Sequence, residues 1–347
     1  MNLPEAQLDY PFNDTLPEPG TAEKICEGVY WLRMGLPFAL NHINLWLLED
    51  GAGWTVIDCG IANDATRASW ETIFSTVLNN KPITRILATH CHPDHLGLAD
   101  WLCQRWQAPL WMSTGEYCFG RLMHAALPGV DGSSSIPHFQ RHGVINPDLI
   151  EQLQGRKNYF PSLVPEVPTS YIRLQENQLI TIGAQEWRVI TGFGHSPEHV
   201  SLHCDALSIL ISGDMLLPRI STNVSVWAVE PEANPVKQFL DSLTKYLPLD
   251  PNTLVLPSHG KPFRGMHTRI AQLNEHHAAR LAEILAITAT PKSAADIVPV
   301  MFPRPLDTHQ LTFALGEALA HLHLLWFAGK LQRQIGIDGI IRFIDAN

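Results

Sequence analysis

Three histidines and an aspartate stand within six residues of this sequence, directly after a short apolar run. The stretch reads THCHPDHLG from Thr89 to Gly97, and its candidate metal ligands are His90, His92, Asp94 and His95. The residues before it, RILATH at 85–90, have the composition of a buried strand. A ligand at the end of a strand is held rigidly by the sheet yet points into the loops. The chain must therefore build a sheet whose edge carries a polar cleft.

Further residues that can bind metals follow strand-like segments later in the chain. His195 follows EWRVITGFG, Asp214 ends LSILISGD, and His259 ends TLVLPSHG. Isolated histidines are usually core or surface residues, but these recur at strand ends beside glycine or turn residues. Imidazole nitrogen and carboxylate oxygen, without thiolate, favour zinc, with iron or manganese as alternatives.

Composition narrows the class of protein. The 347 residues are 45% hydrophobic, which suffices for one large domain or two ordinary ones. A net charge of −10 argues against a general nucleic-acid coat or an anionic membrane surface. The six cysteines form no CxxC pair, the N-terminus has no signal-peptide pattern, and no apolar run is long enough to span a membrane. We expect a soluble cytoplasmic protein without membrane contact.

Strand-like segments occur in two groups along the chain. The first group comprises 28–33, 43–49, 54–60, 85–90 and 109–113, and the second comprises 179–183, 186–192, 199–204, 207–214 and 253–260. Helical spacing is found at 62–79, 96–106 and 233–247, and again near 266–288, 293–301 and 308–329. The chain closes on a predicted hairpin that turns at Asp338-Gly339. Residues 120–170 are rich in Pro, Gly, Ser and His, and only one helix is predicted there, near 147–157.

Four motifs resemble those of the metallo-beta-lactamase-fold hydrolases: HCHPDH (90–95), GFGHSPEH (192–199), SGD (212–214) and PSHG (257–260). The resemblance covers about residues 25–265. It implies an α/β fold, an αββα sandwich of two mixed sheets with helices outside and the metals at one sheet edge. It also implies that His90, His92 and His195 hold a first metal, that Asp94, His95 and His259 hold a second, and that Asp214 bridges them. Asp58 of Asp58-Cys59-Gly60 would orient a histidine ligand, and His199 would be a structural hydrogen-bonding residue.

The full ligand set is similar to that of binuclear hydrolases such as glyoxalase II. True β-lactamases of the family often place cysteine or another residue where this chain has Asp214. We therefore predict two divalent ions, zinc first and iron or manganese as alternatives, which share a bridging hydroxide. Asp94 and Asp214 belong to the predicted catalytic centre, and a small ester-like bond, in a thioester or related acyl compound, is the predicted target.

Three other functions stay open. They are cleavage of RNA phosphodiesters, a mono-iron persulfide dioxygenase, and a non-catalytic metal-binding module. The dioxygenase would not need the second-site set of Asp94, His95 and His259. The sequence has no G-x-S-x-G elbow, so a serine hydrolase is not expected.

Three parts are predicted along the chain: an N-terminal extension at 1–24, a catalytic domain at 25–265, and a C-terminal winged-helix-like domain at 266–347. The insert at about 120–170 is expected to wall the pocket, with a homodimer contact as the alternative. Its pocket candidates are His124, His138, His142, Tyr159 and Phe160. Between Pro305 and Gly329 there is no lysine or arginine, so we expect this helix to pack against the protein and not to bind nucleic acid.

Overall fold

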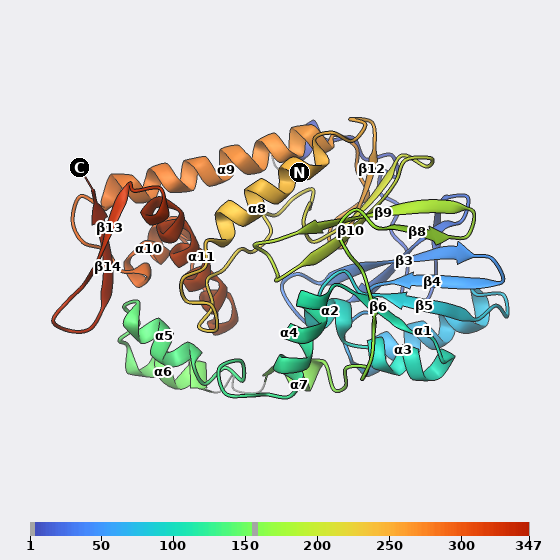
Figure 1. Cartoon of the computed structure of the whole chain (residues 1–347), viewed down its shortest axis with the longest axis horizontal. Coiled ribbons are helices and arrows are strands. Elements are labelled where there is room, and N and C mark those ends of the chain that lie inside the picture. Colours follow the sequence, from blue (N-terminus) through green and yellow to red (C-terminus); the bar gives the residue numbers. More distant parts are fainter. Residues whose placement is uncertain (1–3, 155–158, 347) are drawn as a thin grey trace.

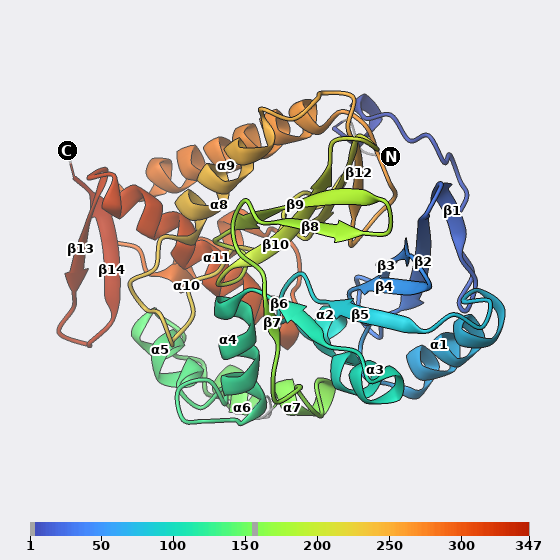
Figure 2. The same cartoon turned by 45° about the vertical axis from the view of Figure 1, so that its right-hand side comes forward.

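Two β-sheets pack face to face, and helices cover the outer side of each (Figure 1 and Figure 2). The computed structural model describes residues 4–154 and 159–346. The first sheet runs in chain order through β1 (Glu23–Cys26), β2 (Val29–Gly35), β3 (His42–Asp50), β4 (Gly53–Ile57), β5 (Ile83–Leu87), β6 (Leu110–Met112) and β7 (Ile172–Arg173). The second has the order β12 (Leu254–Pro257), β11 (Ile209–Gly213), β10 (His199–Cys204), β9 (Gln185–Gly192) and β8 (Leu179–Ile182). Both sheets are mixed, since β4–β7 and the pair β11–β12 are parallel and the other pairs are antiparallel.

The space between the sheets is filled by large apolar side chains. Trp31 and Trp46 of the first sheet stack with ring centroids 6.2 Å apart, and both are fully buried. They share one core cluster with Trp187 and Leu202 of the second sheet. A sheet covered on both faces needs strands that are apolar nearly throughout, which explains the continuous run INLWLL in β3.

The outer layers are helical. The helices α1 (Asp64–Thr76) and α3 (Ala99–Trp106) pack against the first sheet through residues such as Trp70 and Leu102. The second sheet is covered by α8 (Pro235–Leu243) and α9 (Met266–Ile287), which bury Phe239 and Ile270 against it. The predicted αββα sandwich is therefore confirmed.

The strands that deliver the candidate ligands end earlier than predicted. β4 ends at Ile57, one residue before Asp58, and β5 ends at Leu87, three residues before His90. β11 and β12 likewise stop just before Asp214 and His259. These residues leave the hydrogen-bond ladder, and Asp58 adopts a φ of 62°, outside the β region. The ligands His90, Asp214 and His259 therefore lie on the loops that follow the strands.

Residues 120–170 contain more helices than the one predicted near 147–157. Four short helices occupy the region: α4 (Thr114–His124), α5 (Ser135–Arg141), α6 (Pro147–Gln154) and α7 (Tyr159–Leu163). Each has at most 11 residues, so no apolar period is long enough to be recognised. The end of the helix predicted near 147–157 falls outside the described residues. Phe139 and Leu153 pack into the same core cluster as the C-terminal helices, whereas Phe160 packs with the first sheet.

The C-terminal part contains the predicted helices and hairpin. α9 is followed by α10 (Ala294–Met301), α11 (Thr308–Phe327) and the pair β13 (Leu331–Ile335) and β14 (Ile341–Asp345), with Gly339 at a φ of 77° in the turn. α11 is buried on most sides, and Leu315 and Leu322 join the core cluster of α8 and α9. Among the helices of residues 4–154 and 159–346, none is both long and apolar enough to cross a membrane.

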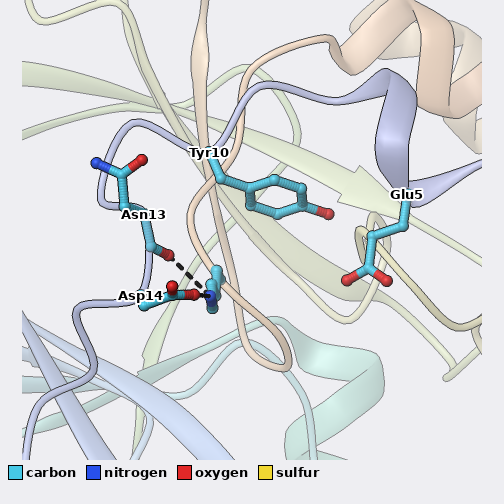
Figure 3. A pocket seen from close by; sticks show the side chains of 5 residues that line it. Glu5, Tyr10, Asn13 and Asp14 are labelled. Atoms are coloured by element: carbon cyan, nitrogen blue, oxygen red, sulfur yellow. Dashed lines mark hydrogen bonds and ion pairs between the residues drawn. The ribbon is translucent and has the colours of Figure 1, made fainter. Parts of the chain in front are cut away.

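The N-terminal segment lies against the connection between β12 and α9. Asp9 and Arg264 exchange backbone hydrogen bonds, and Lys261 Nζ donates to Asn13 O at 2.8 Å and to Asp14 Oδ1 at 2.9 Å. Asn13, Asp14 and Lys261 line a pocket together with Glu5 and Tyr10 (Figure 3). Because Lys261 follows His259 by two residues, these bonds anchor the N-terminal segment beside a candidate ligand loop.

Gly97, next to the ligand motif, is predicted to tolerate no side chain. A Cβ there would lie 2.5 Å from Pro93 O and 2.7 Å from Ala62 N. Gly97→Ala should lower the free energy of unfolding by about 1–3 kcal/mol, the usual cost of overpacking. Urea denaturation of the metal-free protein measures this cost. The control is Gly35→Ala, where an added Cβ meets nothing within 4 Å, and equal effects of the two substitutions would contradict the packing argument.

Candidate metal centre

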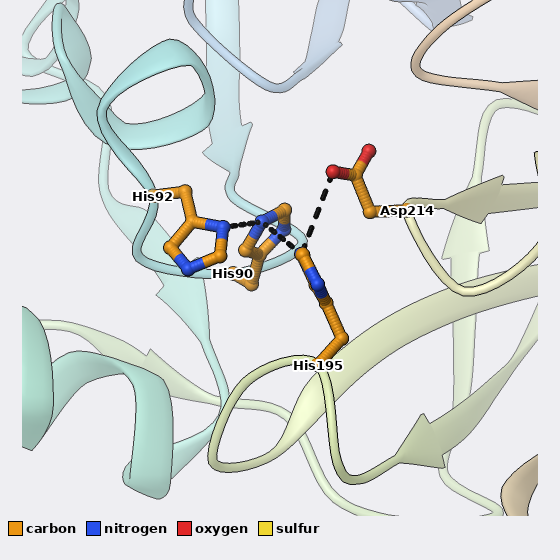
Figure 4. Close-up of side chains that lie close together, drawn as sticks. All are labelled: His90, His92, His195 and Asp214. Atoms are coloured by element: carbon orange, nitrogen blue, oxygen red, sulfur yellow. Dashed lines mark hydrogen bonds and ion pairs between the residues drawn. The ribbon is translucent and has the colours of Figure 1, made fainter. Parts of the chain in front are cut away.

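Three histidines from both sheets meet at the edge of the sandwich (Figure 4). His90 follows β5, His92 precedes the short helix α2 (Pro93–Leu96), and His195 lies between β9 and β10. His90 Nε2 is 2.9 Å from His92 Nδ1 and 3.2 Å from His195 Nε2. The three rings therefore direct one nitrogen each at a common point.

The tautomer of His195 follows from the hydrogen bond that its Nδ1 atom makes. His195 Nδ1 lies 2.8 Å from Asn223 O, and a carbonyl can only accept, so Nδ1 carries the proton. A neutral ring then has a lone pair on Nε2, the atom that faces His90 and Asp214. That is the tautomer a metal ligand needs.

A second group lies on the other side of Asp214. It consists of Asp94 and His95 from α2 and His259 from the loop after β12. Asp94 Oδ2 is 3.4 Å from His259 Nε2 and 3.6 Å from His95 Nε2. His259 Nδ1 donates to the carbonyl of His42 at 2.8 Å, so this ring also presents an unprotonated Nε2 to the group when neutral.

Asp214 lies between the two groups, with one carboxylate oxygen toward each. Its Oδ2 is 3.4 Å from His195 Nε2, while its Oδ1 is 3.4 Å from His259 Nε2 and 3.6 Å from His95 Nε2. This is the placement that a bridging ligand requires. The structure thus brings all seven predicted ligands together.

The donor set fits two divalent cations. His95 Nε2 and Asp214 Oδ1 are buried and have no hydrogen-bond partner among the described residues, which is costly unless something else binds them. Four zinc ligands at about 2.0–2.1 Å from the metal lie about 3.3 Å apart, close to the spacings within each group. The ligand atoms are nitrogen and carboxylate oxygen throughout, so zinc, iron and manganese all suit the site.

The electrostatics of the site favour bound positive charge. Burial and neighbouring histidines lower the pKa of His92 to about 3, so that ring is neutral near pH 7. Burial alone would lower the pKa of His95 as well, but the carboxylates Asp58, Asp94 and Asp214 outweigh it and raise that pKa to about 9. A divalent cation can replace the proton that these carboxylates attract and leave the imidazole neutral.

The two residues predicted to support the ligands both contact them. Asp58 accepts from His95 Nδ1 at 2.8 Å and from the backbone N of Thr89 at 2.7 Å, which orients His95 and joins it to the end of β5. His199 is buried, and its Nε2 accepts from the backbone N of Asp214 at 3.1 Å.

The five pocket candidates of the insert lie in other surroundings. His124 Nδ1 is 3.0 Å from Val164 O, and the buried rings of His138 and His142 pack together with centroids 4.8 Å apart. The ring of Tyr159 lies 6.2 Å from that of His309 on α11, and Phe160 belongs to the core beside the first sheet. Through these contacts the five residues take part in the packing of the insert and in its contact with α11. That they line a pocket stays a prediction.

Sequence patterns did not reveal several residues that hold the site. The acceptors His42 O and Asn223 O are backbone atoms, which no side-chain pattern indicates. Glu116 is a buried carboxylate that bonds two ligand loops. The S-x-x-E pattern of Ser113 to Glu116 could have drawn attention to it, since this pattern marks helix starts.

Comparisons with known proteins show which family the chain is similar to. The family model described as "Metallo-beta-lactamase superfamily" matches residues 40–259, and that described as "Metallo-beta-lactamase-like, C-terminal domain" matches 281–346. A crystal structure of a beta-lactamase domain protein from Burkholderia ambifaria is 56% identical with a TM-score of 0.95, covering 99% of this chain and 100% of that one. A metallo-beta-lactamase family protein from Thermus thermophilus is 27% identical with a TM-score of 0.77, covering 93% and 100%. The "Probable metallo-hydrolase YqjP" of Bacillus subtilis is 23% identical over 325 residues, covering 86% of this chain and 92% of its own.

Asp214→Ala is expected to impair the centre far more than Asp58→Ala. Asp214 faces both ligand groups, whereas Asp58 acts through His95 alone. Loss of a residue that only orients a ligand typically costs about 10–100-fold in metal affinity or activity. Competition with a chelator measures the metal affinity of each variant. Equal losses in the two variants would argue against a bridging position of Asp214.

Proposed function

The chain belongs to the metallo-beta-lactamase superfamily, and we propose on this premise that it is a binuclear metallohydrolase that cleaves a small ester-like bond. A thioester or related acyl compound is the proposed substrate, and zinc is the proposed metal, with iron or manganese as alternatives. The observation that carries the proposal is Asp214, which places one oxygen toward each of two preassembled ligand groups.

Two bound divalent cations would supply an activated water as nucleophile and polarise the scissile carbonyl. The residues of the chain prepare that chemistry. His195, His95 and His259 each have Nδ1 beside an outer acceptor, so their Nε2 atoms face the reaction space. Asp94 and Asp214 add negative charge that would retain the cations, and the rings of His90, His95 and His259 are buried.

A group of half-buried aromatic rings favours a substrate that carries an uncharged, apolar group. On α11, His309 stacks on Phe38 with centroids 5.6 Å apart and lies 4.9 Å from Phe313, which in turn lies 5.9 Å from Trp227. Phe38 precedes His42, and Trp227 follows Asn223, the two residues whose carbonyls accept from ligand histidines. The rings are therefore carried by the same segments that support the metal ligands.

The alternative functions are less well supported. The ring-bearing helix α11 has no lysine or arginine, which disfavours binding of RNA phosphates. The second ligand group, Asp94, His95 and His259, would be superfluous in a mono-iron dioxygenase. A non-catalytic module would have no need of a bridging carboxylate. A cytoplasmic location and a homodimer were predicted from the sequence, and they remain proposals.

The purified protein is expected to bind close to two metal ions per chain, because the seven ligands form two groups joined by Asp214. Elemental analysis measures the metal content, and thioester hydrolysis should disappear on chelation and return with added zinc. One iron per chain, together with full activity of His259→Ala, would exclude the binuclear centre. Metal-dependent RNA cleavage without thioester hydrolysis would favour the nuclease alternative.

Phe313→Ala is expected to weaken binding of substrates with a large apolar acyl group. Such ring contacts contribute about 0.5–1.5 kcal/mol each, so KM for an aryl-acyl thioester should rise about 2- to 13-fold while metal content stays unchanged. Phe327→Ala is the matched control, since Phe327 lies on the same helix but at its far, exposed end. Steady-state kinetics with acetyl and aryl-acyl thioesters measure the effect, and an equal change for both substrates would contradict an apolar subsite.

A further inference from the structure

The first turn of α4 has the sequence of a capping box but uses its glutamate differently. In a capping box, S-x-x-E, the glutamate side chain returns to the backbone N–H of the N-cap serine. Glu116 instead accepts from the backbone N of Glu198 with Oε1 at 2.7 Å and from the backbone N of Cys91 with Oε2 at 2.9 Å. The carboxylate is fully buried. In α10, by contrast, Ser293 and Asp296 form a capping box of the usual kind.

The two amides belong to the loops that carry the candidate ligands. Cys91 lies between His90 and His92, on the loop after β5 of the first sheet. Glu198 lies between His195 and His199, on the loop between β9 and β10 of the second sheet. One carboxylate therefore joins two loops that come from opposite sheets.

The rest of the helix start is shaped to receive the second of these loops. Ser113 Oγ donates to Glu198 O at 2.6 Å, and the backbone N of Gly115 donates to Glu198 Oε2 at 2.8 Å. A Cβ on Gly115 would lie 2.8 Å from Glu198 Cβ, so a larger residue would displace the loop. The N-terminal end of the helix also favours the buried negative charge of Glu116.

We propose that Glu116 is a positioning residue that sets the distance between the His90–His92 loop and the His195 loop. The inference rests on the proposed metal centre. The nitrogens of these histidines lie 2.9–3.2 Å apart, so a small shift of either loop would change the spacing of the ligand atoms. A carboxylate with two fixed acceptor oxygens can hold both loops at once, and it thereby prepares the centre before a metal binds.

Two variants of Glu116 distinguish the effect of side-chain length from the effect of charge. Glu116→Gln keeps the length but offers one oxygen, so one of the two amides loses its acceptor. Glu116→Asp keeps the charge but is one methylene too short to bond both loops. Asp296→Asn is the matched control, because it weakens a capping carboxylate on α10 that has no contact with the ligand loops.

Three measurements on full-length protein test the inference. They are the affinity for Co²⁺ by chelator competition, the visible absorption of the Co²⁺ protein, and amide exchange of peptides spanning 90–95 and 195–199 in the metal-free state. Both Glu116 variants should lose about 10–100-fold in affinity, change the Co²⁺ spectrum and exchange faster in both peptides. The Asp296 variant should leave all three unchanged.

Wild-type affinity, spectrum and exchange in both Glu116 variants would overturn the inference, as would equal changes in Asp296→Asn. If the wild-type protein bound no Co²⁺, the proposed function would fail, while the exchange measurement would still decide the role of Glu116. Should the Glu116 variants prove insoluble, Gly115→Ala displaces the same loop with Glu116 intact and must produce the same faster exchange at 195–199.

Discussion

Each of three inward-facing histidine rings is held by an acceptor on its outer side, and the candidate centre depends on this. His95 is held by Asp58, His259 by the carbonyl of His42, and His195 by the carbonyl of Asn223. Because a neutral imidazole has one proton, an outer acceptor directs the lone pair inward. Without these acceptors each ring could turn or change tautomer, and the same residues at the same positions would form an ordinary hydrogen-bonded cluster.

The carboxylates of the site attract positive charge, which a proton or a cation can supply. The carboxylates Asp58, Asp94 and Asp214 all act on the buried His95, and they raise its pKa against the effect of burial. Buried carboxylates need a positive partner, and in the metal-free chain the protonated ring of His95 supplies part of it. A cation that binds only the folded state adds to its stability, which couples metal occupancy to stability.

The sequence predicted the parts of the molecule in which chemistry and pattern coincide. The ligand residues recur after apolar strands in motifs that resemble one family, and that resemblance implied both the sandwich and the seven side chains. The short helices α4, α5 and α7 could not, because each is only 5–11 residues long and its apolar face is completed by distant segments. The roles of His42 and Asn223 could not be predicted either, since their contribution comes from carbonyl oxygens that every residue has. Glu116 belongs to an S-x-x-E pattern, but that pattern indicates a helix cap and not a bond between two loops.

The C-terminal helices contribute to the architecture of the candidate centre, although none of the seven predicted ligands lies on them. Asn223, which orients His195, lies on the loop after β11, and α11 holds that loop in place. The backbone N of Val226 donates to Gly316 O at 3.1 Å, and the Glu317 side chain hydrogen-bonds to that of Asn223. A Cβ on Gly316 would lie 2.7 Å from Ser225 Cβ, so the loop and the helix approach as closely as glycine permits. The orientation of a ligand from the second sheet thus depends on a helix that follows the sandwich in sequence, and the folding of the C-terminal part becomes a condition for a complete metal site.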